Sequence, residues 1–352
     1  MNFSSDNVAG IAPEILAAIT AANAGKDASY GEDAVSARLE RRVAEVFEHE
    51  VVVFPVATGT AANALALASL VPPWGTVYCH AEAHIVVDEC GAPEFYTGGA
   101  RMAAIEAPHG KIGASDLARL LPGGKGIVHH MQPAAVSLTQ ASEAGTVYRS
   151  AEIAAIAEIA KKHGLALHMD GARFANAVAF LGCAPADLTW RAGVDALSFG
   201  ATKNGAAAAE AVIFFDRAKA AEFAFRRKRG GHLFSKMRFL SAQLEAYVAD
   251  ELWLRNARHA NAMAARLGEG LQAVPGARLR HPVEANEVFV ELPEPVIDGL
   301  LGQGFQFYRW VGNCVRLVTA FDTEGEEVEA LIAAARGLAG VGAAPGNVSS
   351  PL

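Results

Sequence analysis

Short apolar segments alternate with segments of helical pattern along most of the chain, and this alternation limits the folds that the chain can adopt. The predicted strands are 51–54, 76–79, 126–131, 165–170, 196–200 and 211–215, and the predicted helices between them are 61–70, 115–121, 150–163 and 185–192. Several strands are apolar on both faces, which is typical of a parallel sheet covered by helices on both sides. We therefore predict a three-layer α/β fold with a mostly parallel central sheet.

The pattern changes near residue 251. A long helix, 251–271, precedes a strand at 288–292, a helix at 295–301, strands at 305–310 and 315–319, and a final helix at 323–338. This order predicts a smaller C-terminal α+β domain. We expect a large domain at 1–250 with an N-terminal arm, a small domain at 251–340, and a flexible Gly-, Ala-, Pro- and Ser-rich tail at 341–352.

Composition excludes several classes of protein. Of 352 residues, 52% are hydrophobic and 19% are charged, which is the reverse of a disordered chain. The 30 Lys and Arg residues against 38 Asp and Glu give a net charge of −8, which disfavours a protein that coats nucleic acid or an anionic membrane. The basic run 226–229 is short and is typical of a solvated helix end. We expect a small-molecule substrate, with no nucleic-acid or membrane partner.

The cysteines and the N-terminal residues bear on the compartment. Four cysteines lie far apart without a CxxC pair, as expected for reduced thiols in a cytoplasmic enzyme without a disulfide framework or metal site. The first residues lack the pattern of a signal peptide. Residues 51–79 carry no charged side chain, but Pro55 and Gly59 divide them into a strand, a turn and a helix rather than a membrane span.

Polar residues suited to one chemistry follow three predicted strands. Gly59 and Thr60 lie at a strand-to-helix turn, which is either an ordinary turn or a phosphate site made by backbone amides. Asp170 ends an apolar strand, at the edge where open α/β sheets bind ligands. Lys203 follows another apolar strand among small residues, either as a surface lysine or as an amine that forms a Schiff base. Together they supply the anchor, carboxylate and lysine that pyridoxal phosphate (PLP) requires.

Eight blocks along nearly the whole chain carry a family resemblance. They are Ser4-Ser5-Asp6-Asn7, Tyr30-Gly31-Glu32-Asp33 with Arg38-Leu39-Glu40, Thr58-Gly59-Thr60-Ala61 with Asn63, His80 with His84, Glu143 with Gly145-Thr146-Val147-Tyr148, His168-Met169-Asp170-Gly171-Ala172-Arg173, Lys203-Asn204-Gly205, and Val315-Arg316-Leu317-Val318-Thr319 with Asp322-Thr323. In this order the blocks resemble the fold-type-I PLP enzymes, and more closely the low-specificity L-threonine aldolases of the β-eliminating lyase group.

The resemblance implies roles around the cofactor. Lys203 would bind PLP covalently, Asp170 would hold the proton of the pyridine nitrogen, and Gly59 with Thr60 would bind the phosphate. His84 would stack on the cofactor ring and serve in proton transfer.

The resemblance also implies how the substrate is held. Arg316 and Arg173 would clamp the substrate carboxylate, with Arg173 also near the cofactor and Ser5 as a hydroxyl donor. Tyr30 and Arg229 would reach the site of a neighbouring subunit, so that a homodimer or homotetramer shares its active sites.

The implied reaction is cleavage of L-threonine or L-allo-threonine to glycine and acetaldehyde. A phenylserine-type aldolase and a β-eliminating lyase of the same fold are alternatives. From another class, a cofactor-free phosphate-binding or regulatory module on the same scaffold is a further alternative.

The chain departs from the family pattern at one position. Many members carry a histidine near the substrate hydroxyl, before a Gly-x-Val turn, and alignment of Gly145 with that turn puts Gln140 at this place. Glutamine can hydrogen-bond the hydroxyl but cannot titrate. We therefore predict a hydroxyl contact for Gln140 and leave the base open between His84, a bound water molecule, and His129 or His130.

Overall fold

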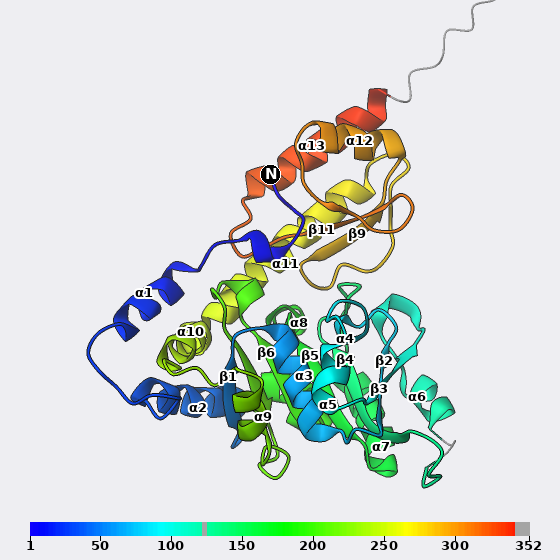
Figure 1. Cartoon of the computed structure of the whole chain (residues 1–352). Helices are drawn as coiled ribbons and strands as arrows, with labels where there is room; N and C mark the ends of the chain where they lie inside the picture. The colour runs from blue at the N-terminus through cyan, green and yellow to red at the C-terminus, as the bar shows by residue number, and fades with distance from the viewer. Residues whose placement is uncertain (122–124, 342–352) are drawn as a thin grey trace, which may run out of the picture.

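The computed structural model describes residues 1–121 and 125–341. Within these residues, the larger region of the molecule is built around a seven-stranded sheet (Figure 1). Its order is β1-β7-β6-β5-β4-β2-β3. The strands are β1 (Val52–Val56), β2 (Gly75–His80), β3 (Arg101–Ile105), β4 (Gln132–Thr139), β5 (Ala166–Gly171), β6 (Ala196–Gly200) and β7 (Glu210–Phe214). β7 is antiparallel to β1 and β6, and the remaining pairs are parallel. The prediction of a mostly parallel sheet is confirmed.

Helices cover both faces of this sheet. One face carries α3 (Gly59–Leu70), α4 (His84–Val87), α5 (Ala92–Thr97) and α9 (Phe223–Arg229), and the other carries α2 (Ala34–Phe47), α7 (Ser150–His163), α8 (Phe174–Leu181) and α10 (Arg238–Val248). Consecutive residues of β6 pack on opposite sides, with Ala196 against α3 and Leu197 in the cluster of α2 and α8. A strand buried on both faces needs apolar residues at every position, which explains its continuous apolar sequence.

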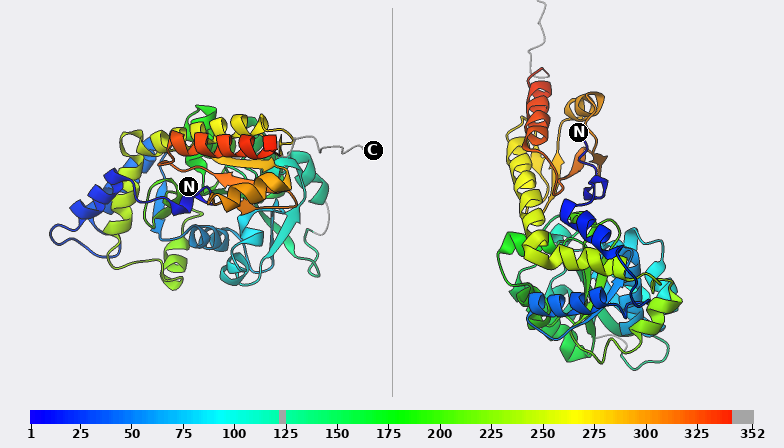
Figure 2. Two further views of the ribbon diagram at one scale, coloured as in Figure 1. Left: turned by 90° about the horizontal axis from the view of Figure 1, so that it is seen from above. Right: turned by 90° about the vertical axis from the view of Figure 1, so that its left-hand side faces the viewer.

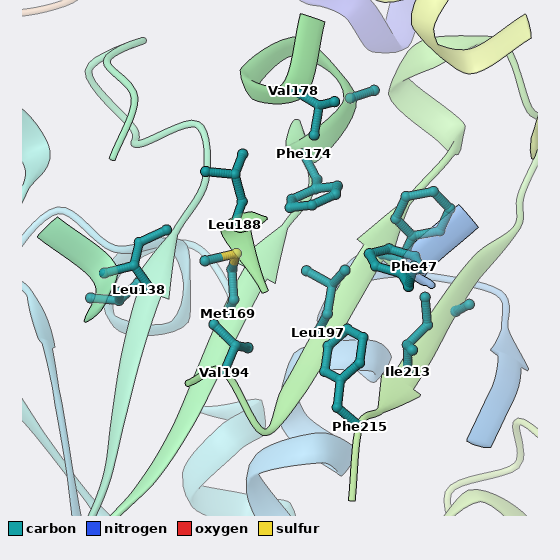
Figure 3. Close-up of a cluster of buried hydrophobic side chains, with 14 of the residues drawn as sticks. Phe47, Leu138, Met169, Phe174, Val178, Leu188, Val194, Leu197, Ile213 and Phe215 are labelled. Carbon is teal, nitrogen blue, oxygen red and sulfur yellow. The ribbon is translucent and has the colours of Figure 1, made fainter. Parts of the chain in front are cut away.

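The larger of the two apolar layers is built around aromatic side chains (Figure 3). The Phe47 ring lies 5.9 Å from that of Phe174, 6.0 Å from that of Phe199 and 5.4 Å from that of Phe215, between ring centroids. Met169 and Leu197 join the same cluster from β5 and β6. This core fixes the carboxyl ends of the central strands relative to one another.

A second apolar core lies in the C-terminal region. The sheet β10-β11-β9-β8 is antiparallel, and its strands are β8 (Arg278–Leu279), β9 (Glu287–Glu291), β10 (Tyr308–Arg309) and β11 (Cys314–Val318). It packs with α11 (Leu252–Gln272), α12 (Glu294–Gly302) and α13 (Gly325–Val341). Helix α11 joins the two regions, because its Ala257 lies in the first core and its Ala264 in the second.

The N-terminal segment crosses to this second core (Figures 1 and 2). Phe3 is 1% exposed and packs among its apolar residues, while its amide donates to the carbonyl of Gln306 at 2.8 Å. Its carbonyl accepts from the amide of Val318 at 2.8 Å. The expected large domain, 1–250, includes Phe3 in its N-terminal arm. In the structure, Phe3 packs with the C-terminal region instead. The remaining elements at this end are η1 (Asp6–Val8) and α1 (Pro13–Ala22).

Several predicted elements differ from the structure. The predicted strand 126–131 is wrong, because this segment is a turn and β4 begins at Gln132. Gly126 has a φ of +81°, and its amide donates to the Gln132 side chain, which closes the turn. The predicted helix 185–192 consists of two short 3-10 segments, η3 (Pro185–Leu188) and η4 (Trp190–Ala192).

Other elements complete the described chain. Among the elements that were not predicted are β3, β8, α1, α2, α4, α5, α8, α10 and η2 (Pro108–Gly110), and the helix predicted at 115–121 is α6 (Ala114–Leu120). The tail predicted to be flexible lies outside the described residues beyond residue 341. In the described part of the chain, no helix has both the length and the apolar character needed to cross a membrane.

Candidate active site

A cavity of about 360 Å³ lies at the carboxyl ends of β5 and β6. It brings together five predicted site residues: Gly59, Thr60, His84, Asp170 and Lys203. The other residues that line it are Asn7, Ala57, Thr58, Ala62, Ala172, Ser198, Gly200, Thr202, Ala208 and Glu210. A larger groove of about 920 Å³ includes the segment that leads into β5, and none of the predicted site residues lines it. The first cavity is the candidate site, because ligands of α/β sheets bind at this edge.

The N-terminus of α3 forms one wall of the cavity. Thr58 caps the helix, since its Oγ1 accepts from the amide of Ala61 at 3.2 Å and its carbonyl accepts from the amide of Ala62 at 3.0 Å. The first two amides of the helix, those of Gly59 and Thr60, therefore point out of the helix end. A Cβ built on Gly59 meets nothing within 4 Å, so open space adjoins this end. Such an end attracts an anion.

Asp170 is held at the cavity by two hydrogen bonds. The carboxylate is 4% exposed, and its Oδ2 accepts from Asn63 Nδ2 at 2.7 Å. Its Oδ1 accepts from the amide of Ala172 at 3.0 Å. A carboxylate fixed in this way by α3 and by its own turn can hold a proton on a ligand nitrogen.

Lys203 lies in the turn η5 (Thr202–Asn204), directly after β6. Asn204 anchors this turn, because its Nδ2 donates to the carbonyl of Trp253 at 2.8 Å. Glu210 lies at the start of β7, opposite the end of β6, and accepts from the amide of Ala201 at 2.9 Å. Burial raises the pKa of Glu210 to about 7.

A hydrogen-bonded chain links His84 to Asp170. His84 Nδ1 lies 2.9 Å from Glu89 Oε1, and the same oxygen accepts from Asn63 Nδ2 at 2.8 Å. The Glu89 side chain is fully buried, whereas that of His84 is 35% exposed. The hydrogen bond to Glu89 raises the pKa of His84, and burial raises the pKa of Glu89. Glu89 therefore keeps a proton on Nδ1 and leaves Nε2 of the neutral ring as an acceptor.

A buried histidine lies beneath this wall. His168 Nδ1 is 2.9 Å from Ser137 Oγ and its Nε2 is 3.0 Å from Ser198 Oγ, so that one imidazole spans β4, β5 and β6. Burial lowers the pKa of His168 to about 4, which keeps the ring neutral. Since Ser198 lines the cavity, His168 fixes part of its floor.

The two predicted clamp arginines are paired with carboxylates. Arg173 donates from Nε and Nη2 to Asp6 at 2.8 and 3.0 Å, and its Nη1 lies 3.3 Å from Glu287 Oε2. Arg316 donates from Nε and Nη2 to Glu287 Oε1 at 3.0 and 2.9 Å. Burial opposes the charge of Asp6, yet the charges of Arg173 and Lys203 hold its pKa below its ordinary value. Glu287 thus bridges both arginines.

Ser5, Tyr30 and Arg229 lie outside the cavity of this chain. Ser5 Oγ caps η1 by accepting from the amide of Asn7 at 3.1 Å, and Asn7 rather than Ser5 lines the cavity. The Tyr30 side chain is 46% exposed, with the Lys228 ammonium 4.8 Å from its ring centroid. Arg229 is exposed at the end of α9. The predicted roles of Tyr30 and Arg229 in a neighbouring subunit remain predictions.

Gln140, predicted to contact the substrate hydroxyl, lies away from the cavity, and its predicted contact stays a prediction. Its side chain is 0% exposed and bonds at both ends to the backbone of Tyr148, with Nε2 donating to the carbonyl and Oε1 accepting from the amide, each at 2.9 Å. It does not line the cavity. His129 and His130, the other candidates for the base, lie in the exposed turn before β4.

Five residues of the site were not assigned a role from the sequence: Asp6, Asn63, Glu89, Glu143 and Glu287. Three of them, Asp6, Asn63 and Glu143, lie inside the eight sequence blocks that carry the family resemblance, although no role was inferred for them. Glu89 and Glu287 carried no signal, because their partners come from other elements. Among the described residues, no group of three or more His, Cys, Asp or Glu side chains is arranged to hold a metal ion.

The fold and the site define a class. A mostly parallel sheet with a lysine, a carboxylate and a helix N-terminus at one cavity, joined to a smaller antiparallel domain, is the architecture of fold-type-I enzymes. The model of the beta-eliminating lyase family matches residues 2–294, and the chain belongs to this family.

Relatives and solved structures agree with this assignment. The low specificity L-threonine aldolase of Pseudomonas aeruginosa is 46% identical over 330 residues, which cover 94% of this chain and 95% of that protein. A second Pseudomonas protein of the same name is 45% identical over 94% of this chain and 96% of its own length. The structure of Leishmania major threonine aldolase matches with a TM-score of 0.90 and 30% identity, over 96% of this chain and 99% of that one.

Proposed function

We propose that this chain is a PLP-dependent aldolase that cleaves L-threonine or L-allo-threonine to glycine and acetaldehyde. The observation that carries the proposal is the convergence of Lys203, Asp170 and the N-terminus of α3 on one cavity. Membership of the beta-eliminating lyase family and the similarity to L-threonine aldolases support it.

The residues of the cavity fit PLP. The open space beside Gly59 and the two outward amides suit its phosphate, the buried carboxylate of Asp170 suits its pyridine nitrogen, and the Lys203 amine suits its aldehyde. When bound, PLP supplies a ring that takes up the negative charge left at the substrate Cα. His84, on the wall of the cavity, would restrain the tilt of that ring.

The arginine cluster would bind the substrate carboxylate. Glu287 uses Nε and Nη2 of Arg316, which leaves the Nη1 edge of this guanidinium for a second carboxylate. Arg173 is 6% exposed and is held bidentately by Asp6, so it would act mainly by placing Glu287 and the N-terminal segment. A fixed substrate carboxylate sets which bond to Cα is aligned for cleavage.

We further propose a cytoplasmic homodimer or homotetramer with shared active sites. All four cysteines are free, which suits a reducing compartment. The exposure of Tyr30 and Arg229 leaves both side chains accessible to a neighbouring subunit. Sedimentation analysis would separate the dimer from the tetramer.

Product analysis tests the proposed reaction. Purified protein incubated with PLP and L-threonine should release glycine and acetaldehyde, and Lys203→Ala should release neither and lose the visible absorbance of bound PLP. Pyruvate and ammonia from serine or an aromatic amino acid, without glycine from threonine, would assign a β-eliminating lyase instead.

A further inference from the structure

A rigid turn between β4 and α7 places Glu143 next to His84, a residue that lines the cavity. The amide of Ser142 donates to the carbonyl of Thr146 at 2.8 Å, and the two hydroxyls of these residues lie 2.7 Å apart. Gly145 has a φ of +70°, and a Cβ there would come within 3.1 Å of the Glu287 carbonyl oxygen. Hydrogen bonds within the turn and its close packing against β9 therefore hold the turn in place, and with it the backbone of Glu143.

The Glu143 carboxylate lies among the residues of the proposed active site. Its Oε1 accepts from the backbone amide of His84 at 3.1 Å. The charged groups that act on it are Asp170 of β5, Lys203 of η5, Glu287 of β9, and Arg173 at the start of α8. Asp170 and Lys203 are proposed to hold PLP, and Glu287 is bonded to Arg316, which is proposed to bind the substrate carboxylate. Glu143 therefore lies near the place where the substrate would bind.

Glu143 is held by fewer groups than the carboxylates around it. Asp6 and Glu287 are paired with arginines, and Glu89 is held by His84 and Asn63. Glu89 Oε2 and Glu287 Oε2 also lack a hydrogen-bond partner, but the other oxygen of each carboxylate accepts two hydrogen bonds. In the described residues, the hydrogen bond from His84 is the one that holds the Glu143 side chain, and its Oε2 has no hydrogen-bond partner. An acid–base group needs such an unoccupied oxygen.

The electrostatics of this carboxyl group agree with its position. Burial and the charge of Asp170 raise the pKa of Glu143 to about 7, against the opposing effect of Lys203. A group that titrates near neutral pH can both accept and return a proton under ordinary conditions.

We infer that Glu143 takes the proton of the substrate β-hydroxyl when the Cα–Cβ bond breaks, an assignment that rests on the proposed function. The O–H bond breaks and its proton moves to Oε2, while the oxygen electron pair forms the carbonyl bond of the aldehyde. The electrons of the Cα–Cβ bond stay with Cα, which gains one proton to give glycine. One proton leaves the hydroxyl and one is added to Cα, so no further reactant is needed.

Glu143→Gln tests this assignment. Glutamine keeps an oxygen for the His84 amide but cannot accept the proton, so a purely structural role would survive the change. We expect kcat for L-threonine cleavage to fall by about 100-fold or more. PLP absorbance and the dissociation constant of glycine, which has no hydroxyl, should stay unchanged. The rise of kcat/KM through about pH 7 should disappear in Glu143→Gln and persist in Glu143→Asp.

Glu82→Gln is the matched control, because Glu82 is an exposed carboxylate beside the same helix α4. It should retain the activity and pH profile of the parent protein. Cleavage by Glu143→Gln within about threefold of the parent rate, or a parallel loss of glycine and PLP binding, would overturn the assignment. If Glu143→Gln does not fold, a pH profile of Glu143→Asp identical to that of Glu143→Ala would overturn it too. A parent protein that releases no glycine from threonine would refute the proposed function itself.

Discussion

Replacement of Asp6 by asparagine removes one charge from a deeply buried ion pair of the site. The side chains of Asp6 and Arg173 are 1% and 6% exposed, and two hydrogen bonds of 2.8 and 3.0 Å join them. Loss of one partner leaves a buried guanidinium without full compensation, which typically costs about 3–5 kcal/mol. We expect the lower end, about 3 kcal/mol, because Glu287 stays 3.3 Å from Arg173.

The assay is denaturant unfolding of parent and Asp6→Asn, followed by far-ultraviolet circular dichroism at pH 7. The control is Glu291→Gln, which breaks a similar forked pair with Arg278, a side chain that is 76% exposed. This exposed pair should contribute about 1 kcal/mol or less. Equal losses in the two variants would refute the claim that burial makes the Asp6 pair different.

The pH dependence of this effect has a definite sign. The pKa of Asp6 is lowered on folding from an ordinary value of 3.8, so its stabilising contribution is present above that value. The contribution is lost as the pH falls below 3.8 through the lower pKa of the folded state. The stability difference between parent and Asp6→Asn should therefore be constant near neutral pH and shrink below pH 3.8. A difference that grows on acidification would contradict the reasoning.

Three further changes test separate parts of the site. Arg316→Ala should abolish binding of amino acids while PLP remains bound, and unchanged threonine affinity in a titration would exclude Arg316 from carboxylate binding. Thr58→Ala removes the cap of α3 and should cost about 1 kcal/mol of unfolding free energy, with weaker PLP binding by fluorescence titration; an unaltered PLP affinity would count against the phosphate site. Glu89→Gln should lower the pKa of His84, since Glu89 raises it; an NMR titration that shows no shift would disprove the pairing.

The sequence predicts the part of the site that follows from strand order. Asp170 lies at the end of one apolar strand and Lys203 follows the neighbouring one, and parallel neighbours end at the same edge of a sheet. Their meeting at one cavity could therefore be expected from the pattern. The same argument predicts the position of Gly59, because Gly59 begins the helix that follows a strand.

The sequence does not predict contacts that depend on tertiary packing. Glu287 meets Arg173 from another domain, and Phe3 enters a core whose other residues lie some 260 or more positions later. The turn after β4 directs the Gln140 side chain to the backbone of Tyr148 and brings Glu143 to the amide of His84, and the sequence pattern indicates neither contact. The apolar residues after Gly126 resemble a strand, although the turn closed by Gln132 places the true strand later.

Reductive trapping of the cofactor tests the central claim most directly. Protein incubated with PLP is treated with borohydride, which fixes PLP to the amine that carries it, and is then digested for mass spectrometry. We predict a single modified peptide containing Lys203, and none in Lys203→Ala. Modification of another lysine in the parent protein, or no modification at all, would contradict the assignment of this cavity as the PLP site.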